Sequence, residues 1–375
     1  MGKKEVLMVV DSLGNGGVER VVTNIISHID TERFMVYVYV LYRDQVYCQK
    51  QVESCGAIVI NTYEDELQKH RHTSKRIVLY REISRFLKNH PDICAVHVHC
   101  ANQSPEVLLA AKRRGIRTIC IHAHVAFSPY WNPVRTSLKS KVAHRVYQCA
   151  YRTLATCRMG CSQMACESIF GAKSSYKVIL NGMDFQKFNP DSYEPKSILR
   201  EKYQLEMKTI NFLFVGRFAT QKNILFMLEV LSHVAKSYDI HLTVAGYGEL
   251  EKEAKKKVTE LGMDDYVRFV PGDSNIPELM KAHDYFICPS LSEGLGITFL
   301  EAQMMGLTAF ASDAVPGEAD LGRCKFFTLS KGAEHYAKEV MACLESPSCD
   351  KLDDQKVNAY QMKEIVKELE KIYGA

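Results

Sequence analysis

Residues Tyr285 to Gly306 read Y-F-I-C-P-S-L-S-E-G-L-G-I-T-F-L-E-A-Q-M-M-G and predict a strand, a glycine loop and a helix in succession. The apolar run from Tyr285 to Cys288 is typical of a buried strand. A loop with two glycines follows, and a helix is expected to begin near Ile297. A strand that leads through a short loop into a helix is the repeating unit of a doubly wound parallel sheet, so this stretch predicts an α/β fold.

The loop and the helix start also have the features of a ligand site. Gly294 and Gly296 let the backbone approach a ligand closely, and the first turn of the helix offers unpaired N–H groups that suit a phosphate. Glu293 on the loop and Glu301 on the helix are separated by seven residues. Because a carboxylate would repel a phosphate, Glu301 is expected to bind a neutral group such as a ribose diol, and Glu293 a second polyol. The alternative is a solvated helix start that binds nothing.

This loop and helix resemble the E-x7-E signature of the retaining family-4 glycosyltransferases. Members of that family have the GT-B architecture, in which two Rossmann-like α/β domains face each other across a cleft, and they take a sugar from a nucleotide diphosphate. The resemblance implies that Gly294, Leu295, Gly296, Ile297 and Thr298 bind the nucleotide sugar together with Glu301. The later run S-D-A-V-P-G-E is especially similar to the bacterial exopolysaccharide and capsule subgroup.

Length and composition fit such a protein. The 375 residues are enough for two domains, and 46% hydrophobic and 25% charged residues are ordinary for a soluble globular chain. No apolar run approaches the length of a membrane-spanning helix, and the amino-terminal residues do not predict a signal peptide. Thirteen cysteines without a C-x-x-C pair favour a reducing, cytoplasmic location. The net charge of +4 is too small to predict nucleic-acid binding.

The amino-terminal half predicts the same strand, loop and helix unit at its start. A strand from Val6 to Asp11 leads into a loop that contains Gly16 and Gly17, and then into an amphipathic helix from Val18 to Ile29. The glycines do not match G-x-G-x-x-G, so no dinucleotide site is predicted. The loop is either a tight turn or, as the resemblance implies, a segment whose amides face a phosphate or the reacting sugar.

Two later strands end in histidine pairs, His97 with His99 and His122 with His124. Each pair is expected on one face of its strand, at the carboxyl end where open α/β sheets bind ligands. Zinc would need a third ligand, and the sequence has no D-x-D pair for Mg²⁺, so no metal site is predicted. A structural histidine that bonds a loop carbonyl is the simpler alternative. The resemblance implies that a histidine here faces the donor sugar, with His124 preferred and His122 left open.

Residues 107–166 contain no Asp or Glu but ten Lys or Arg, together with Tyr130 and Trp131 and an expected helix from Val134 to Leu154. A basic amphipathic stretch of this kind suits an anionic membrane surface, at about 1 kcal/mol for each basic residue near it. The residues expected to make that contact are Lys112, Arg113, Arg114, Arg135, Lys139, Lys141 and Arg145. A solvated basic face and a pocket for a phosphate-bearing acceptor are the alternatives.

The carboxyl-terminal half contains a second phosphate motif. Arg217 follows a strand from Ile210 to Val215, and Lys222 precedes a helix, so the two cations can clamp a diphosphate. The spacing G-R-x4-K-N is similar to the donor-phosphate motif of the same family. The resemblance also places Gly248 and the loop that ends at Ile276 in the nucleotide site.

The predicted domains are residues 1–188, completed by a carboxyl-terminal helix at about 355–375, and residues 189–354. The segment from Asp191 to Tyr203 lacks an apolar period and is expected to be a linker. Within this frame the catalytic residues are His124, Glu293, Arg217 and Lys222.

The predicted activity is transfer of a sugar, with retention, from a nucleotide diphosphate sugar to a lipid-linked or oligosaccharide acceptor in surface-polysaccharide synthesis. UDP is the expected nucleotide and GDP the alternative. No metal or other cofactor is expected, and the protein is expected in the cytoplasm, with peripheral contact to the inner membrane surface. Two other functional classes stay open: a GT-B UDP-sugar epimerase or phosphorylase, and a non-catalytic partner subunit.

Overall fold

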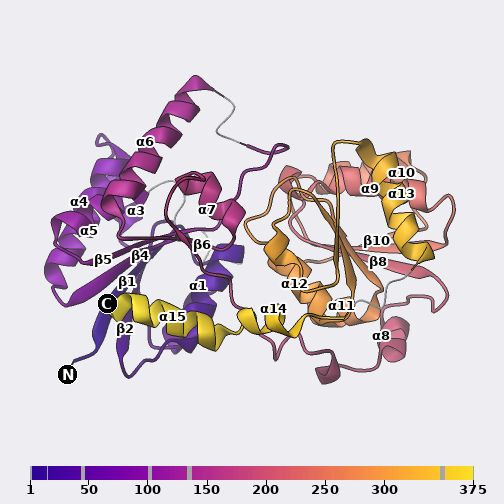
Figure 1. Ribbon diagram of the computed structural model, residues 1–375, viewed down its shortest axis with the longest axis horizontal. Coiled ribbons are helices and arrows are strands. Elements are labelled where there is room, and N and C mark those ends of the chain that lie inside the picture. Colours follow the sequence, from indigo (N-terminus) through magenta and orange to yellow (C-terminus); the bar gives the residue numbers. More distant parts are fainter. Residues whose placement is uncertain are drawn as a thin grey trace. The chain divides into compact units, whose positions relative to one another are not determined.

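The computed structural model describes residues 2–14, 16–43, 47–99, 104–132, 137–346 and 351–374 (Figure 1). They form two compact units, each with its own sheet. The chain passes from the first unit to the second between Met183 and Asp184, five residues before the expected boundary, and returns at Ala359. Residues Ser128–Trp131 also belong to the second unit, which the sequence did not indicate.

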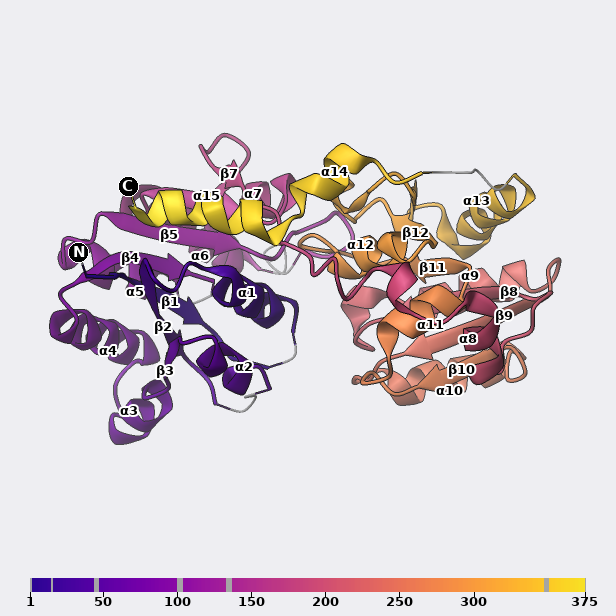
Figure 2. The same cartoon turned by 90° about the horizontal axis from the view of Figure 1, so that it is seen from below.

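The first unit contains a seven-stranded sheet in the order β3-β2-β1-β4-β5-β6-β7, in which every neighbouring pair is parallel. Its strands are β1 (Lys4–Val10), β2 (Phe34–Val40), β3 (Ile58–Ile60), β4 (Ile93–Val98), β5 (Thr118–Ala123), β6 (Cys157–Gly160) and β7 (Lys177–Val178). Its helices are α1 (Gly17–His28), α2 (Gln49–Ser54), α3 (Tyr63–Lys69), α4 (Lys75–Asn89), α5 (Ser104–Arg113), α6 (Leu138–Leu154), α7 (Gln163–Phe170) and α15 (Met362–Gly374). Helices cover both faces of this sheet, which explains why β1 is apolar without alternation (Figures 1 and 2).

The second unit contains a six-stranded parallel sheet in the order β10-β9-β8-β11-β12-β13. Its strands are β8 (Ile210–Val215), β9 (Ile240–Ala245), β10 (Val267–Val270), β11 (Tyr285–Cys288), β12 (Thr308–Ser312) and β13 (Cys324–Phe327). Its helices are η2 (Pro190–Ser192), α8 (Lys196–Lys202), η3 (Thr220–Lys222), α9 (Ile224–Val234), α10 (Glu251–Glu260), α11 (Ile276–Ala282), α12 (Ile297–Met304), η4 (Gly317–Ala319), α13 (Gly332–Glu345) and α14 (Asp354–Ala359). The doubly wound α/β fold predicted for both halves is confirmed.

The prediction of a linker was wrong, because residues 196–202 within it form helix α8. The helix has little apolar surface, but Leu199 is fully buried and Arg200 is 5% exposed. The guanidinium of Arg200 donates to both carboxylate oxygens of Asp284 at 2.7 and 2.6 Å, and Lys196 donates to the same carboxylate at 2.7 Å. Ionic contacts therefore replace most of the apolar face that helix prediction relies on.

The expected terminal helix is interrupted at Tyr360 and Gln361, after which α15 packs on α1 and β4 of the first unit (Figure 2). The backbone N–H of Met183 donates to the carbonyl oxygen of Tyr360 at 3.0 Å. The buried face of α15 is formed by Met362, Ile365, Val366, Leu369 and Tyr373, at the spacing of a single helix face. The last helix thus completes the first unit.

Candidate functional site

The strand, loop and helix predicted from residues 285–306 are confirmed as β11, the loop of residues 289–296, and α12. Gly296 is the N-cap of α12 and has a φ of +86°, a conformation that favours glycine. An added Cβ there would lie 2.8 Å from the ring of Phe299. Because the first N–H groups of a helix lack partners within it, the amides of Ile297 and Thr298 are suited to bind an anion.

Glu293 lies at the centre of a polar network on this loop. Its Oε1 atom accepts hydrogen bonds from the Nζ of Lys222 and from the Oγ of Ser290, both at 2.6 Å. The side chain of Glu293 is 8% exposed and that of Lys222 is 21% exposed. Burial alone would lower the pKa of Lys222, but the charge and hydrogen bond of Glu293 outweigh it and the pKa is raised. Lys222 is therefore a fixed cation.

Side-chain hydrogen bonds join the η3 segment to the same loop. The Nε2 of Gln221 donates to the carbonyl oxygen of Ser292 at 2.8 Å, and the Nδ2 of Asn223 donates to that of Pro289 at 3.1 Å. Asn223 has a φ of +57°, which asparagine tolerates better than most residues. These contacts hold Lys222 beside Glu293, and sequence reasoning missed them together with Ser290. Gln221 and Asn223, which flank Lys222 in the sequence, were the signal from which these contacts could have been predicted.

Arg217 lies on the loop after β8, and β8 pairs directly with β11. Its side chain is exposed, and no described residue forms an ion pair with its guanidinium. Its charge nevertheless acts against protonation of Lys222, so the two cations are close. Because β8 and β11 are parallel neighbours, the loops that follow them, with Arg217 and Lys222 on one and Glu293 on the other, lie at the same end of the sheet. Their binding of a diphosphate stays a prediction.

Two further residues of the predicted nucleotide site have structural explanations as well. Gly248 packs on the backbone of Phe218, where an added Cβ would lie 2.5 Å from the carbonyl oxygen. Ile276 begins α11, whose N-cap Asn275 accepts a hydrogen bond from the N–H of Glu278 at 3.4 Å. On α12, Glu301 is 8% exposed. A nucleotide role for these residues stays a prediction.

Of the glycines expected near the reacting groups in the first unit, Gly16 is the N-cap of α1 and Gly17 its first residue. The loop is closed by Glu19, whose carboxylate accepts a hydrogen bond from Ser12 at 2.8 Å. An added Cβ at Gly16 would lie 2.3 Å from that carboxylate. The tight-turn interpretation thus has a structural basis, and a role toward phosphate or sugar stays a prediction.

The two histidine pairs lie side by side at the carboxyl ends of β4 and β5. His124, the preferred candidate, is half-buried, and its Nε2 atom lies 2.9 Å from the Nδ1 of His99. His122 is 3% exposed, and burial lowers its pKa to about 4. Burial lowers the pKa of His124 as well. All these rings are therefore neutral near pH 7, and the choice between His122 and His124 stays open.

The expected basic surface involves two helices that contact each other, α5 and α6. Lys139, Lys141 and Arg145 are exposed along α6, whereas Lys112, Arg113 and Arg114 are exposed at and just after the end of α5. Arg135 lies outside the described residues. No helix among the described residues combines the length and the apolar character that a membrane-spanning segment needs.

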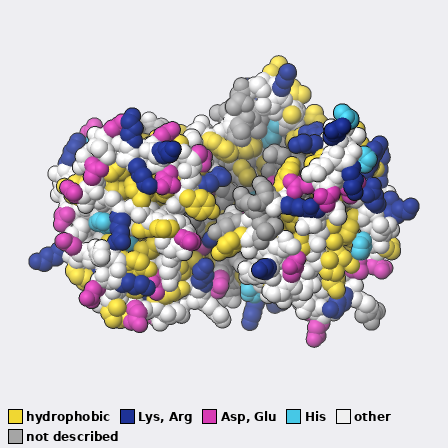
Figure 3. Space-filling model, turned by 180° about the vertical axis from the view of Figure 1, so that it is seen from behind, with side chains coloured by type: hydrophobic (Ala, Val, Ile, Leu, Met, Phe, Trp, Pro, Cys, Tyr) yellow, Lys and Arg dark blue, Asp and Glu magenta, His cyan; other side chains and the backbone are white. Residues whose placement is uncertain are grey.

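The aromatic residues assigned to that surface, Tyr130 and Trp131, are grouped with the second unit. Tyr130 belongs to the second unit, where its hydroxyl donates to Asp313 at 2.9 Å. Exposed apolar side chains on α6 take the place of the aromatics: Leu138 is 76%, Val142 54% and Val146 58% exposed. Their spacing of four residues aligns them along the helix. Hydrophobic and basic side chains lie together over the outer end of this helix (Figure 3).

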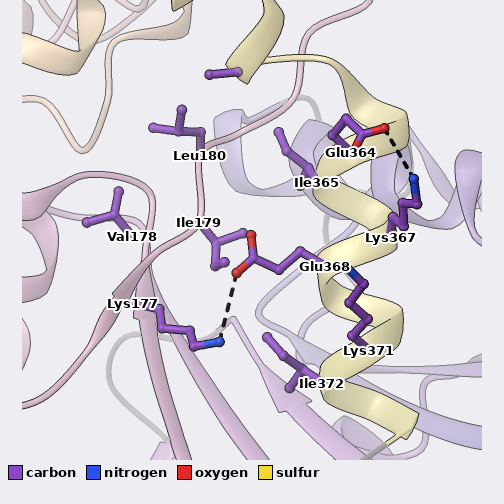
Figure 4. A pocket seen from close by; sticks show the side chains of 11 residues that line it. Lys177, Val178, Ile179, Leu180, Glu364, Ile365, Lys367, Glu368, Lys371 and Ile372 are labelled. Atoms are coloured by element: carbon purple, nitrogen blue, oxygen red, sulfur yellow. Dashed lines mark ion pairs between the residues drawn. The ribbon is translucent and has the colours of Figure 1, made fainter.

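A pocket of about 640 Å³ lies in the first unit between β7 and α15 and contains none of the predicted site residues (Figure 4). Most of its charged groups are paired, since Lys177 lies 3.9 Å from Glu368 and Glu364 lies 3.6 Å from Lys367. We therefore do not assign the chemistry to it.

Comparison with known proteins matches both halves of the chain. A family model described as "Glycosyltransferase Family 4" matches residues 15–187, and one described as "Glycosyl transferases group 1" matches residues 195–362. The EpsF protein of Bacillus subtilis (strain 168), named as a glycosyltransferase, is 25% identical over 85% of this chain and 82% of its own length. An Escherichia coli protein named UDP-Gal:alpha-D-GlcNAc-diphosphoundecaprenol alpha-1,3-galactosyltransferase is 29% identical over 58% of this chain and 57% of its own.

A solved structure supports the fold. Anabaena Alr3699/HepE, crystallised in complex with UDP and glucose, superimposes with a TM-score of 0.72 at 17% identity, covering 99% of this chain and 97% of that one. At this identity the likeness shows the fold alone, which is GT-B.

Proposed function

Because the chain belongs to the family-4 glycosyltransferases with the GT-B fold, we propose that it transfers a sugar from a nucleotide diphosphate sugar to a glycan acceptor in surface-polysaccharide synthesis. UDP is the proposed nucleotide. The complex of HepE with UDP and glucose and the UDP-galactose substrate in the name of the E. coli relative support it. The names of EpsF and of a Staphylococcus aureus capsular polysaccharide biosynthesis glycosyltransferase, CapH, support the polysaccharide role.

The observation that supports the proposal is the ion pair of Lys222, which follows β8, with Glu293 on the loop that leads into α12. When the bond between the anomeric carbon and the diphosphate breaks, the leaving diphosphate gains negative charge. Groups that stabilise this charge more in the transition state than in the bound substrate speed the reaction. Arg217, Lys222 and the amides of Ile297 and Thr298 supply such stabilisation without a metal ion.

The acidic pair would then bind the uncharged parts of the donor. Glu293 uses its Oε1 atom to hold Lys222 and Ser290, so its second oxygen is proposed to accept a sugar hydroxyl. Glu301, on the first turns of the same helix, is proposed to accept hydrogen bonds from the ribose. Glu293 therefore both positions the cation and binds the sugar.

Retention of the anomeric configuration is part of the proposal. We propose a same-face route, in which the acceptor attacks from the side that the diphosphate leaves. A neutral imidazole from His124, or from His122, would orient the sugar by hydrogen bonding.

The exposed side chains of α6 are the basis on which we propose a lipid-linked acceptor. Lys139, Lys141 and Arg145 lie on the same helix as the exposed Leu138, Val142 and Val146, and this combination is that of a helix at an anionic membrane surface. The diphosphoundecaprenol acceptor in the name of the E. coli relative gives this proposal further support.

The proposal is tested by incubating the purified chain with UDP-sugars and GDP-sugars, with and without lipid diphosphate sugar acceptors, and analysing the products. Release of UDP together with an elongated acceptor is the expected result. A changed sugar without any acceptor would instead establish an epimerase, and release that requires inorganic phosphate would establish a phosphorylase. Donor binding without turnover across the acceptor panel would point to a non-catalytic subunit.

A further inference from the structure

The rings of His97, His99, His122 and His124 lie together at the carboxyl ends of β4 and β5, two neighbouring strands of the first sheet. Val98 on β4 pairs with Ile121 on β5, so the residues that follow these strands are neighbours. The ring centroids of His97 and His99 are 4.0 Å apart, and each lies 5.4 Å from that of His122. His97 is fully buried, and His99 and His122 are 4% and 3% exposed.

These rings contain buried nitrogen atoms without hydrogen-bond partners. They are the Nε2 of His97, the Nε2 of His99, both nitrogens of His122 and the Nδ1 of His124, although a backbone hydrogen bond with Ile179 contributes to the pKa of His122. An unsatisfied buried polar atom costs free energy, and native structures contain few of them. Several such atoms in one cluster, all from the same residue type, therefore require an explanation.

The opposite nitrogens of two of these rings do have partners. The Nδ1 of His97 lies 2.6 Å from the hydroxyl of Tyr373, and the Nδ1 of His99 lies 2.9 Å from the Nε2 of His124. If each Nδ1 donates its proton to these partners, each Nε2 carries a free lone pair. Metal-binding histidines are oriented in this way, with one nitrogen on the ion and the other donating to a neighbour.

We propose that His97, His99 and His122 bind one divalent transition-metal ion of the zinc class. Their ligand atoms lie within 4.8 Å of one another, whereas two nitrogens on a tetrahedral zinc ion are roughly 3.3 Å apart, so small ring rotations close the site. Imidazole ligands suit Zn²⁺, Ni²⁺ and Cu²⁺, whereas Mg²⁺ and Ca²⁺ prefer oxygen. Sequence reasoning treated the two pairs separately and therefore lacked the third ligand.

All three rings are buried, and imidazole binds metals in its neutral form. Three neutral ligands leave the charge of the ion uncompensated, so the fourth position would hold water, hydroxide or another anion. Tyr373 lies on α15, so the ion would connect the sheet to the returning carboxyl-terminal helix. The site goes beyond the proposed transfer reaction, and with His122 on the ion the role of orienting the sugar falls to His124.

The test uses the full chain, stripped with a chelator and titrated with Co²⁺ and Zn²⁺. One equivalent of Co²⁺ should give the intense visible bands of a tetrahedral site, and one equivalent of Zn²⁺ should abolish them and raise Tm. His122→Gln should lose the bands. Tyr373→Phe, which keeps the ring but removes the partner of His97, should retain them with affinity about 10- to 100-fold weaker.

His283→Gln is the matched control. His283 is also buried, but both its nitrogens are bonded, to the carbonyl oxygen of Leu279 at 2.6 Å and to Thr243 at 2.7 Å. This variant should bind Co²⁺ as the unaltered chain does. Only weak octahedral bands in the unaltered chain, as exposed histidines give, would overturn the proposal whatever the variants do. So would a folded His122→Gln protein with unchanged bands, or unchanged affinity in Tyr373→Phe.

Discussion

The Nζ atom of Lys222 lies 2.6 Å from the Oε1 atom of Glu293, and this ion pair joins the loops that follow β8 and β11. In the absence of a ligand the carboxylate compensates the cation, which is why the half-buried lysine remains protonated. A diphosphate that binds there has to share Lys222 with Glu293. The pair therefore holds the cation in position before the donor arrives.

Replacing Lys222 with alanine should lower kcat roughly a hundredfold or more, because it removes one stabilising group from the leaving diphosphate. Steady-state kinetics with the preferred nucleotide sugar measure this effect. Lys256→Ala is the control, because Lys256 is 78% exposed on α10 and should leave kcat unchanged. Equal rates in Lys222→Ala and the unaltered protein would refute the donor site.

The Arg217→Ala variant tests whether Arg217 acts in catalysis or in stabilising the fold. The guanidinium is exposed and has no ion-pair partner among the described residues, so Tm should change by no more than a degree or so, whereas kcat/KM should fall about a hundredfold. Differential scanning calorimetry and kinetics on the same preparation measure both quantities. A large drop in Tm with unchanged kcat/KM would show that Arg217 has a structural role instead.

Gly296→Ala should destabilise the protein by about 1–2 kcal/mol and weaken UDP binding. The alanine Cβ meets both a φ of +86° and the ring of Phe299, so the loop has to shift at the start of α12. Urea unfolding and UDP titration calorimetry are the measurements. Gly317→Ala is the control, because nothing lies within 4 Å of an added Cβ there, and it should change neither quantity. Normal UDP affinity in Gly296→Ala would argue against a nucleotide at this helix start.

The environment of Asp284 predicts that the free energy of unfolding of the second unit falls at acid pH. Burial alone would raise its pKa, but Lys196, the N–H of Asn211 and Arg200 outweigh this effect and lower it. A carboxyl group with a lowered folded-state pKa stabilises the protein above its unfolded pKa, about 3.9, and that contribution is lost as pH falls through the folded value.

Asp284→Asn should therefore lower the free energy of unfolding by about 2–3 kcal/mol at pH 7, partly because the buried Arg200 loses its counter-charge. The difference from the unaltered protein should shrink toward pH 3. Urea unfolding at both values measures it, with the exposed Asp273→Asn as control. A difference that is the same at pH 7 and pH 3 would contradict the ionic origin.

The elements that sequence predicted best are those with strong local signals. The apolar runs of β8 and β11 were predicted with the bounds that the structure has, because burial on both faces leaves continuous apolar segments. Strands β6 and β13 were missed, since each has only four residues and one of them is charged. Helix α8 was missed because its contacts are ionic.

The residues of the candidate site were likewise predicted only where they belong to a local motif. Arg217, Lys222, Glu293 and the glycine loop could be predicted because each belongs to a contiguous motif. The meeting of His122 with His97 and His99 depends on which strands pair. No local pattern contains that information.

The basic face of α6 should bind anionic membranes through charge and apolar contact together. Each Lys or Arg near such a surface contributes about 1 kcal/mol, so replacing Lys139, Lys141 and Arg145 with alanine should weaken liposome binding roughly a hundredfold. Sedimentation with anionic vesicles at low salt measures it, and neutral vesicles should bind little. The control variant replaces three lysines of α10, Lys252, Lys255 and Lys256, and removes the same charge elsewhere. If both triple variants lost binding equally, net charge and not α6 would be the cause, and if the unaltered protein did not sediment, the membrane contact itself would be refuted.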